Sequence, residues 1–475
     1  MSLIRVVSVV AFLFGTALAA ANVASAQNCG AGQLAASLAK AAPNSTVRIG
    51  RCTVTGPFSV PAGVTLQGSG SSRTTIVAPA GTAGVLLNAS ASGNYTTLKD
   101  VRVNANGAYG VRITGSGNAR VKNSTVTVTL GAGIAAENVS GEVEIDQVTV
   151  TGPVTSSNAN SLHEAMGDVT GSHGLVLINV GYADIDRSYF NNFSQFGALI
   201  INSDTSWDAG GGSGSIEANA GFHGGTASID AAAFTRAANV NMGDEIGSVG
   251  VGFMGGVYVH SDGMTVSDNP FFGIFMDNVA SAEHEYLRAD RNGLSAAWCQ
   301  NSAYCEIDDA SLNQNAFAGV VMVDVVSALV NQSSIRNTAI GTHAFVGTSG
   351  DGVTLMRSAG LVDSTNLTNN ARAGVAIELG SSQATTDVAF SSTTVNGSGQ
   401  YGVVAQQNGT PIPSYTSGIS RSGNLATADS LFANGTNPLT IAGTQGPCFL
   451  PSALAIATGG LAAVFGDGGD PFPTE

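Results

Sequence analysis

The fold is decided by a repeat that is clearest in residues 281–336, SAEHEYLRADRNGLSAAWCQNSAYCEIDDASLNQNAFAGVVMVDVVSALVNQSSIR. An apolar residue is followed five positions later by a second one, at Ile307/Leu312 and again 23 residues on at Val330/Ile335, and His284/Ala289 fits the same register less well. The pair recurs elsewhere at Leu98/Val103, Val121/Val126, Ile145/Val150, Ile185/Phe190, Ile229/Phe234, Val362/Leu367 and Phe390/Val395. Repetition at this period is typical of solenoids.

A second marker, Asn-x-x-x-Gly followed by an apolar residue, supports the same fold. It occurs at Asn106/Gly110, Asn269/Gly273, Asn315/Gly319, Asn337/Gly341 and Asn370/Gly374. Asn and Gly tolerate the left-handed backbone that tight corners need. We therefore predict an all-β parallel β-helix with coils of about 22–24 residues, in which stacked coils bury a continuous core. An antiparallel sandwich is the alternative, but it has no reason to keep one register over most of the chain.

The composition argues for a packed core and against nucleic acid as a partner. The chain has 475 residues, of which 43% are hydrophobic, and its formal net charge is −15. It contains only three lysines, Lys40, Lys99 and Lys122. Because binding phosphates requires clustered Lys and Arg, no nucleic-acid partner is predicted.

Residues 1–26 have the pattern of a signal peptide. Met1–Arg5 supplies a short positive start, Val6–Ala21 an apolar run, and Ala24–Ala26 a small-residue cleavage site. We therefore expect a secreted or cell-envelope protein, cleaved near Ala26. No later stretch of about 18 or more uninterrupted apolar residues appears, so no membrane span is predicted.

Export permits disulfides, and the chain has five cysteines. Cys29 and Cys52 are predicted to staple the first mature segment, and Cys299 and Cys305 to close a small loop. Cys448 is then left over, either free or with a partner that the sequence does not identify. Without a Cys-x-x-Cys or His-bearing zinc spacing, a structural metal site is not expected.

The N-terminal motifs carry a family resemblance. A short amphipathic helix is expected at 34–42, followed by PNSTVRI (43–49), VPAGVTLQG (60–68) and TTI (74–76). This succession resembles the entry of right-handed parallel β-helix proteins of the pectin-lyase-like superfamily, in which a helix caps the first coil. The resemblance covers approximately residues 30–445, and implies a right-handed solenoid with a short N-terminal capping helix.

The domain prediction follows from these signals. It comprises a signal peptide at 1–26, an N-terminal cap at 27–60, a parallel β-helix at 61–447, and a C-terminal cap with a flexible tail at 448–475. Segments near 151–172 and 203–256 are rich in Gly, Ser and Ala, break the period, and are predicted to be irregular insertions.

An outward line of charge follows from the repeat. The residue after the first apolar position is, in chain order, Lys99, Lys122, Asp146, Asp186, Asp230, Glu285, Asp308, Asn331, Asp363 and Ser391. A residue that follows an inward one in a strand points outward, and equivalent positions in neighbouring coils lie about 4.8 Å apart. Glu285 and Asp308 are therefore expected to be immediate neighbours. The line is interpreted as a solvated strip, as a cation site, or as a catalytic acid–base pair.

Candidate catalytic and metal residues follow from this line. Asp186, Asp230, Glu285 and Asp308 are the candidate Ca²⁺ ligands. Polysaccharide lyases of the superfamily that the chain resembles use Ca²⁺ or carboxylate neutralisation with an Arg or Lys base. That likeness implies Asp186, Arg187, Glu285 and Asp308 as catalytic candidates, with Arg288 and Arg291 as further candidate bases.

Two histidines and one tryptophan complete the candidates. His173, in Gly-Ser-His-Gly, resembles the Gly-His-Gly element of polygalacturonase-like hydrolases, but the acidic elements expected before it are missing. His284 is interpreted as a hydrogen-bonded core residue. Trp207 and Asp208, in a Gly-rich loop, are the candidate substrate-binding residues. Trp207 either stacks on sugar rings or plugs the loop onto the stack.

Three functions remain open from the sequence. The first is a solenoid that binds a polysaccharide or cell-surface glycan without catalysis. The second is a polysaccharide lyase or glycoside hydrolase that works in a lateral groove, and the third is a purely structural surface or matrix protein. No Gly-x-Ser-x-Gly elbow, phosphate-binding loop or His-Glu-x-x-His helix is present. A monomer is expected.

If the acidic line binds Ca²⁺, replacing Glu285→Gln together with Asp308→Asn should abolish binding. Two adjacent carboxylates disfavour joint ionisation unless a cation lies between them, so removing both charges removes the reason to bind one. Isothermal titration calorimetry with Ca²⁺ measures the effect, and an unchanged affinity in the double variant would remove the cation site.

Overall fold

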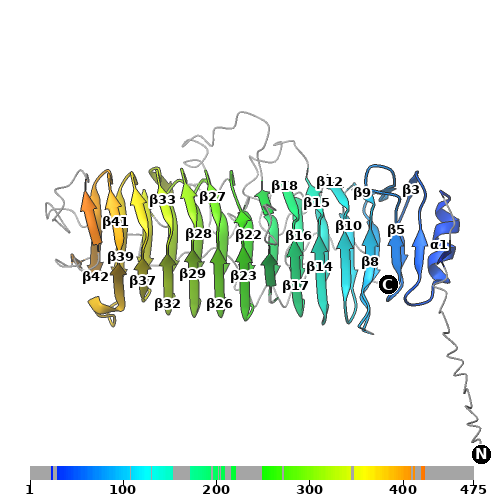
Figure 1. Cartoon of the computed structure of the whole chain (residues 1–475), viewed down its shortest axis with the longest axis horizontal. Helices are drawn as coiled ribbons and strands as arrows, with labels where there is room; N and C mark the ends of the chain where they lie inside the picture. Colours follow the sequence, from blue (N-terminus) through cyan, green and yellow to red (C-terminus); the bar gives the residue numbers. More distant parts are fainter. Residues whose placement is uncertain are drawn as a thin grey trace, which may run out of the picture.

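The chain folds into a solenoid of three parallel β-sheets (Figure 1). The computed structural model describes residues 23–24, 29–91, 93–106, 108–129, 131–152, 172–193, 196–201, 203, 205–208, 216–220, 249–269, 272–343, 347–407, 410–411 and 419–422. Each sheet has 14 strands in the described part of the chain. We call the sheets A, B and C, in the order in which the chain passes through them within each coil.

The strands of each sheet are given in the order in which they are hydrogen-bonded. Sheet A contains β1 (Val23–Ala24), β2 (Thr46–Arg48), β5 (Thr65–Gln67), β8 (Thr96–Lys99), β11 (Ala119–Lys122), β14 (Glu142–Asp146), β17 (Tyr182–Asp186), β20 (Thr205–Asp208), β23 (Tyr258–Asp262), β26 (Ser281–Glu285), β29 (Tyr304–Asp308), β32 (Ser327–Asn331), β37 (Gly360–Asp363) and β40 (Val388–Ser391). Sheet B contains β3 (Thr53–Thr55), β6 (Thr75–Val77), β9 (Arg102–Ala105), β12 (Thr125–Val128), β15 (Thr149–Thr151), β18 (Tyr189–Phe193), β21 (Ile216–Ala220), β24 (Met264–Thr265), β27 (Arg288–Asp290), β30 (Ser311–Asn313), β33 (Ser334–Arg336), β38 (Asn366–Thr368), β41 (Thr393–Asn396) and β44 (Ile419–Ser422).

Sheet C contains β4 (Phe58–Val60), β7 (Ala83–Asn88), β10 (Ala108–Thr114), β13 (Gly131–Glu137), β16 (Ser172–Ile178), β19 (Phe196–Ile201), β22 (Val249–Met254), β25 (Phe272–Asp277), β28 (Ser295–Gln300), β31 (Ala318–Val323), β36 (Asp351–Met356), β39 (Ala373–Leu379), β42 (Tyr401–Gln407) and β43 (Thr410–Pro411). A separate antiparallel hairpin joins β34 (Gly341–His343) to β35 (Gly347–Ser349), and a short 3-10 helix, η3, spans Thr385–Asp387.

The predicted parallel β-solenoid is confirmed, and so is its register. Leu98 pairs with Val121, and Ile307 pairs with Val330, as the repeat requires. These side chains lie in one interior hydrophobic core that runs through all three sheets. The register also survives an interruption, because β14 pairs directly with β17 although residues 153–171 intervene.

Three strands within the segment 203–256 take part in the stack. Within it, β20 pairs with β17 and β23, β21 pairs with β18 and β24, and β22 pairs with β19 and β25. The expectation that Trp207 and Asp208 lie in a loop is therefore wrong, because both belong to β20. This strand has only four residues, TSWD, and a glycine-rich stretch follows it, so the apolar repeat cannot be recognised there. Ile229, Phe234 and Asp230 lie outside the described residues.

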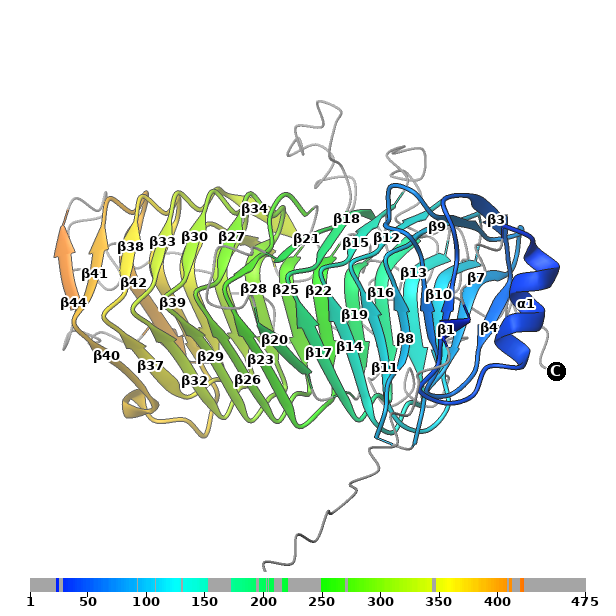
Figure 2. The same ribbon diagram turned by 45° about the vertical axis from the view of Figure 1, so that its right-hand side comes forward.

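The N-terminal end is capped as predicted, by α1 (Ala31–Ala39) (Figure 2). The helix begins and ends three residues before the expected 34–42, and it buries Leu34 and Leu38 against the first strands. Both predicted cysteine pairs, Cys29–Cys52 and Cys299–Cys305, are joined in the structure, whereas Cys448 lies outside the described residues. No helix in the described part of the chain is long and apolar enough to cross a membrane.

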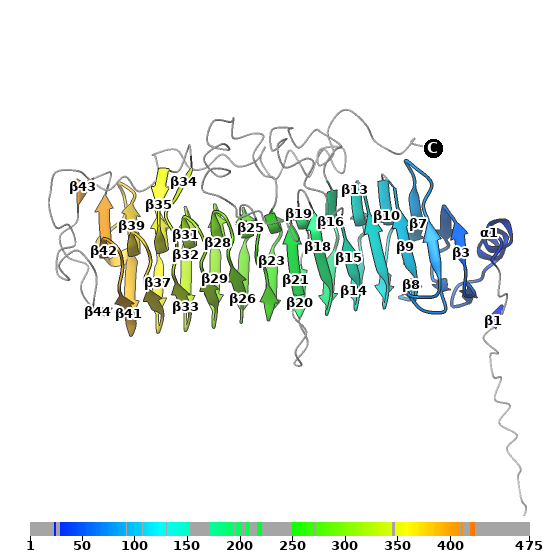
Figure 3. The ribbon, with the colours of Figure 1, turned by 90° about the horizontal axis from the view of Figure 1, so that it is seen from above.

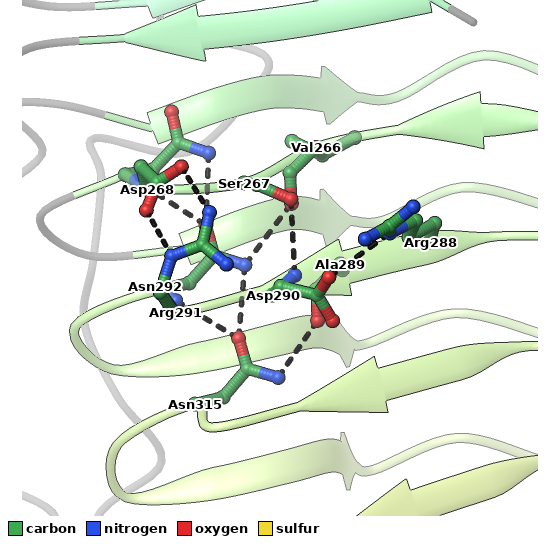
Figure 4. A network of polar contacts seen from close by, with 10 residues as sticks. Val266, Ser267, Asp268, Arg288, Ala289, Asp290, Arg291, Asn292 and Asn315 are labelled. Carbon is green, nitrogen blue, oxygen red and sulfur yellow. Dashed lines mark hydrogen bonds and ion pairs between the residues drawn. The ribbon is translucent and has the colours of Figure 1, made fainter. Parts of the chain in front are cut away.

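A ladder of buried asparagines connects consecutive coils at one corner (Figure 4). The side-chain amide of Asn269 donates to Asn292 Oδ1 at 2.8 Å, and that of Asn292 donates to Asn315 Oδ1 at 3.0 Å. The Asn-x-x-x-Gly marker found Asn269 and Asn315. It missed Asn292, because the fourth residue after it is alanine.

The glycines of this marker are needed to make room for a neighbouring coil, and not for the left-handed corner backbone that was predicted. At Gly110 an added Cβ would lie 2.5 Å from the Gly133 carbonyl oxygen, and at Gly319 it would lie 2.6 Å from that of Gly352. Glycine is therefore required by the close approach of neighbouring coils. The left-handed backbone at corners is instead adopted by residues such as Asn123, at φ 47°.

The asparagine ladder should carry much of the local stability. We expect Asn292→Ala to lower the free energy of unfolding by about 3 kcal/mol, because buried partners in two neighbouring coils lose their hydrogen bonds. Urea denaturation followed by circular dichroism measures this. Asn366→Ala is the matched control, since Asn366 is exposed in the extended strand β38, and it should change stability by less than about 0.5 kcal/mol. Equal effects of the two substitutions would contradict the ladder's role.

Candidate functional site

The candidate site is the outward face of sheet A, where carboxylates line up across the coils. The last residues of five strands form what we call the acidic row: Asp146, Asp186, Asp262, Glu285 and Asp308. Between β17 and β23, the strand β20 ends at Asp208, in register with Asp262. Glu285 pairs in register with Asp308, as predicted, and also with Asp262 on its other side. The sequence repeat missed Asp208 and Asp262, because the inward residue before Asp262 is the polar Ser261.

A repeated corner places these carboxylates at the edge of the face. Among the described residues that follow these strands, the backbone is left-handed, with φ of 44° at Arg187, 51° at Tyr286 and 48° at Asp309. Such a backbone turns the chain sharply away from the sheet. The preceding carboxylate therefore stays in the strand and points outward, because the residue before it points into the core.

Two further rows lie beside the acidic row, one two residues earlier in the strands and the other four residues earlier. Three strands share one pattern, YADID in β17, YVHSD in β23 and YCEID in β29. The middle positions of β23, β26 and β29 bring His260, Glu283 and Glu306 into register. We call the third row, Tyr182, Tyr258, Ser281 and Tyr304, the tyrosine row; its tyrosines stand on every second strand of the sheet. The apolar repeat does not reveal these tyrosines, although the Tyr-x-x-x-Asp spacing is a signal for them.

A compact ion-pair network neutralises the N-terminal end of the acidic row. Asp146 is 3% exposed, and its two carboxylate oxygens each lie 2.6 Å from a cation, Lys122 Nζ and Arg187 Nη2. Arg120 Nε donates to Glu144 at 2.6 Å. The hydrogen bond to Asp146 is the main reason why the pKa of Lys122 is raised.

The ion-pair network argues against the predicted role of Arg187 as a catalytic base. A general base must reach the substrate, whereas Arg187 Nη2 is held 2.6 Å from Asp146 Oδ1 in an ion pair. Arg288 and Arg291 are also held in ion pairs, but they lie away from the acidic row. Arg288 belongs to β27 of sheet B, and Arg291 follows that strand. Arg288 Nε lies 3.0 Å from Asp290, and Arg291 forms two bonds of 2.5 and 2.6 Å with Asp268, which raise its pKa (Figure 4). These contacts favour structural roles for all three arginines.

Beyond the network the face is acidic and carries tyrosine hydroxyls. Among the described residues, no arginine or lysine forms an ion pair with Asp262, Glu285 or Asp308. Tyr258 Oη donates to Glu283 at 3.2 Å, and Tyr304 Oη donates to Glu306 at 2.5 Å. Burial, followed by the neighbouring glutamates, raises the pKa of both phenols.

The predicted calcium site stays a prediction. Neighbouring members of the acidic row, such as Glu285 and Asp308, stand side by side, as a shared cation would require. Yet within the described ranges no three carboxylate, histidine or cysteine side chains form a group that could hold a metal ion. Ca²⁺ prefers six to eight oxygen ligands, and a single row supplies them only in pairs.

Both candidate histidines are buried rather than presented to solvent. His284 is 0% exposed, and its Nδ1 lies 2.6 Å from Ser261 Oγ, as expected for a core residue. His173 is 3% exposed and stacks on Phe196, with ring centroids 5.9 Å apart. Burial lowers the pKa of each imidazole to about 3. Neither histidine lies on the acidic row.

These two imidazoles should make the fold sensitive to mild acid. Both imidazoles stay neutral in the folded chain, whereas the unfolded chain binds protons at both of them below about pH 6.5. The free energy of unfolding is therefore highest above that pH and falls as the pH drops from 6.5 toward 3. We expect the thermal midpoint to fall between pH 6.5 and 5, where carboxylates still remain ionised. A His284→Leu variant should show a shallower fall, and an identical slope in the two proteins would contradict this origin.

One family model matches part of the chain. Residues 272–430 match the family model described as "Right handed beta helix region". None of the curated proteins compared with the chain matches it. Among solved structures, the A-module of a mannuronan C-5 epimerase from Azotobacter vinelandii is 13% identical, with a TM-score of 0.36, over 83% of this chain and 93% of that chain.

Two further solved structures show the same degree of likeness. An alginate lyase from Paenibacillus sp. is 12% identical, with a TM-score of 0.27, over 84% of this chain and 98% of that one. The catalytic unit of an α-1,3-glucanase from Streptomyces thermodiastaticus is 14% identical, with a TM-score of 0.33, over 83% and 65%. None of these likenesses assigns an activity or a residue role to this chain. The chain is a right-handed parallel β-solenoid.

Proposed function

We propose that the protein binds a neutral polysaccharide along the outward face of sheet A between β17 and β29. The observation that carries this proposal is the tyrosine row, which runs beside two rows of carboxylates. Tyr182 is 39% exposed and Tyr258 is 40% exposed, whereas the residues between the rows are buried. The face is therefore a regular array of ring surfaces and hydrogen-bond acceptors.

The spacing of the tyrosines suits a repeating ligand. Tyr182, Tyr258 and Tyr304 stand two strands apart each time, which is about 9.6 Å at the usual strand spacing. This separation is on the scale of two sugar residues in an extended polysaccharide. A glycan chain that runs along the solenoid axis can thus meet an aromatic ring at every second sugar.

The chemistry of the rows also suits sugars. Sugar rings present C–H surfaces that stack on aromatic faces, and hydroxyls that donate to carboxylates. Glu283 and Glu306 already accept hydrogen bonds from tyrosines, so hydroxyl donors are accommodated there. A polyuronate would be repelled, because the face between β23 and β29 has no described cationic partner for its acidic row.

The setting of the protein is part of the proposal. The signal-peptide pattern of residues 1–26 supports export to the cell envelope or the medium, where polysaccharides are abundant. A monomer is proposed as the working unit. A polysaccharide lyase or glycoside hydrolase is the competing function, because adjacent carboxylates such as Glu285 and Asp308 are also the groups that glycosidic chemistry uses.

One assay separates binding from catalysis. Incubation of the protein with neutral polysaccharides and polyuronates, with Ca²⁺ or chelator, is followed by ultraviolet absorbance and by reducing-end measurement. We expect no new products. Unsaturated uronic ends would establish a lyase, and new reducing ends without unsaturation would establish a hydrolase.

Binding should depend on the tyrosine row. We expect Tyr258→Ala to weaken retention in native gels that contain the neutral polysaccharide by about fivefold, the effect of losing one aromatic stacking contact of roughly 1 kcal/mol. Tyr258→Phe should keep most of the retention, because the ring face remains. Tyr189→Ala, on sheet B, is the matched control and should migrate like the unmodified protein. Equal retention of all three variants would rule out this face.

A further inference from the structure

Sheet C differs from sheet A because both of its faces are buried. In sheet A, β26 and β29 alternate between buried and partly exposed residues, as strands with one solvent face do. In the same coils, β25, β28 and β31 of sheet C are buried at every position. Successive residues of a strand point to opposite faces. Something outside the solenoid therefore covers the outward face of sheet C.

The covered face is apolar along most of its length. Its central row contains, strand by strand, Val176, Leu199, Gly252, Phe275, Trp298, Val321, Thr354, Ala376 and Val404. Most of these side chains belong to a hydrophobic cluster that is separate from the interior core. Trp298 is 0% exposed, and its ring lies edge-on to Phe272, with centroids 5.4 Å apart. Such a face would be an aggregation hazard if it met water.

The described elements leave most of this cover unexplained. Sheet C runs along the upper edge of the solenoid in Figure 3. The β34–β35 hairpin begins beside Phe317, since a Cβ on Gly341 would lie 2.8 Å from the Phe317 nitrogen. Its two strands have three residues each, too few to cover a row that extends from β16 to β42. The helix α1 packs at the N-terminal end instead.

We propose that residues 423–475 of this chain lie along the outward face of sheet C and cover its apolar row. The segment starts from β44, whose strand in sheet B is at the same end of the solenoid as β42 (Figure 2). Its 53 residues, 475 minus 422, can extend to about 170 Å. The eight strand spacings from β16 to β42 need only about 38 Å.

The composition of the segment matches the face. It has many apolar residues, including Leu439, Ile441, Phe449, Leu450, Leu454, Ile456, Leu461, Val464 and Phe465. Its charged residues are four acidic ones, of which Asp467, Asp470 and Glu475 stand in the last nine positions. A long, nearly uncharged segment can bury apolar surface against sheet C at little desolvation cost. This cover is independent of the binding proposed for sheet A.

Trp298 offers a direct test in the full chain. The sequence has two tryptophans, so Trp207→Phe leaves Trp298 as the only one. In that background, Leu454→Asp with Ile456→Asp should increase acrylamide quenching of Trp298 several-fold and shift its emission to longer wavelength, since buried charges would lift the segment. Val326→Asp is the matched control; Val326 is 73% exposed, and its substitution should change neither signal. Circular dichroism checks that the solenoid remains folded.

A second measurement needs no destabilising change. A nitroxide label is placed on Cys448, and in further variants on Leu439→Cys or Ile456→Cys with Cys448→Ser. At least one label should strongly reduce Trp298 emission relative to its diamagnetic analogue. Full emission with every label, together with unchanged acrylamide quenching in the Asp variant, would overturn the proposal. Quenching that varies with protein concentration, with a dimer in light scattering, would also overturn it in favour of a second copy as the cover.

Discussion

The step between neighbouring coils is the constraint on which the rest of the molecule depends. Parallel strands stack at about 4.8 Å, and every row of side chains inherits that spacing. The close approach leaves no room for a Cβ at Gly110 or Gly319. It also brings Asn292 within hydrogen-bond distance of Asn269 on one side and of Asn315 on the other. The same step that builds the core therefore sets the distance between carboxylates and between tyrosines on the surface.

Much of the fold could be predicted because inward residues repeat at the coil period. Pairs such as Ile307/Leu312 are visible in the sequence, and they stack where the repeat places them. The prediction fails where an inward position is polar, as at Ser261, or where a short strand stands among glycines, as at Trp207. The periodicity of apolar residues does not reveal such coils, although β20 and β23 pair with their neighbours in the sheet.

The candidate site was predictable only in part, and for a similar reason. One outward row could be counted from the inward residue before it, which placed Glu285 next to Asp308. The tyrosine row lies four residues earlier, at the start of each strand, where the repeat gave no anchor. Contacts such as that between Arg187 and Asp146 depend on side-chain conformation across coils, which a one-dimensional pattern does not contain. These ion pairs neutralise the acidic row at its N-terminal end, at Asp146.

The pairing of β14 with β17 across an intervening segment has a consequence for how such a surface changes over evolution. Chain length can vary at a corner without moving any row, because the ladder closes again in register on the far side. Adding or removing a whole coil would lengthen or shorten the surface by one fixed increment, with the same chemistry on each side of the change. The length of the surface along the solenoid axis is thus a whole number of coil spacings, set by the number of repeats in the sequence.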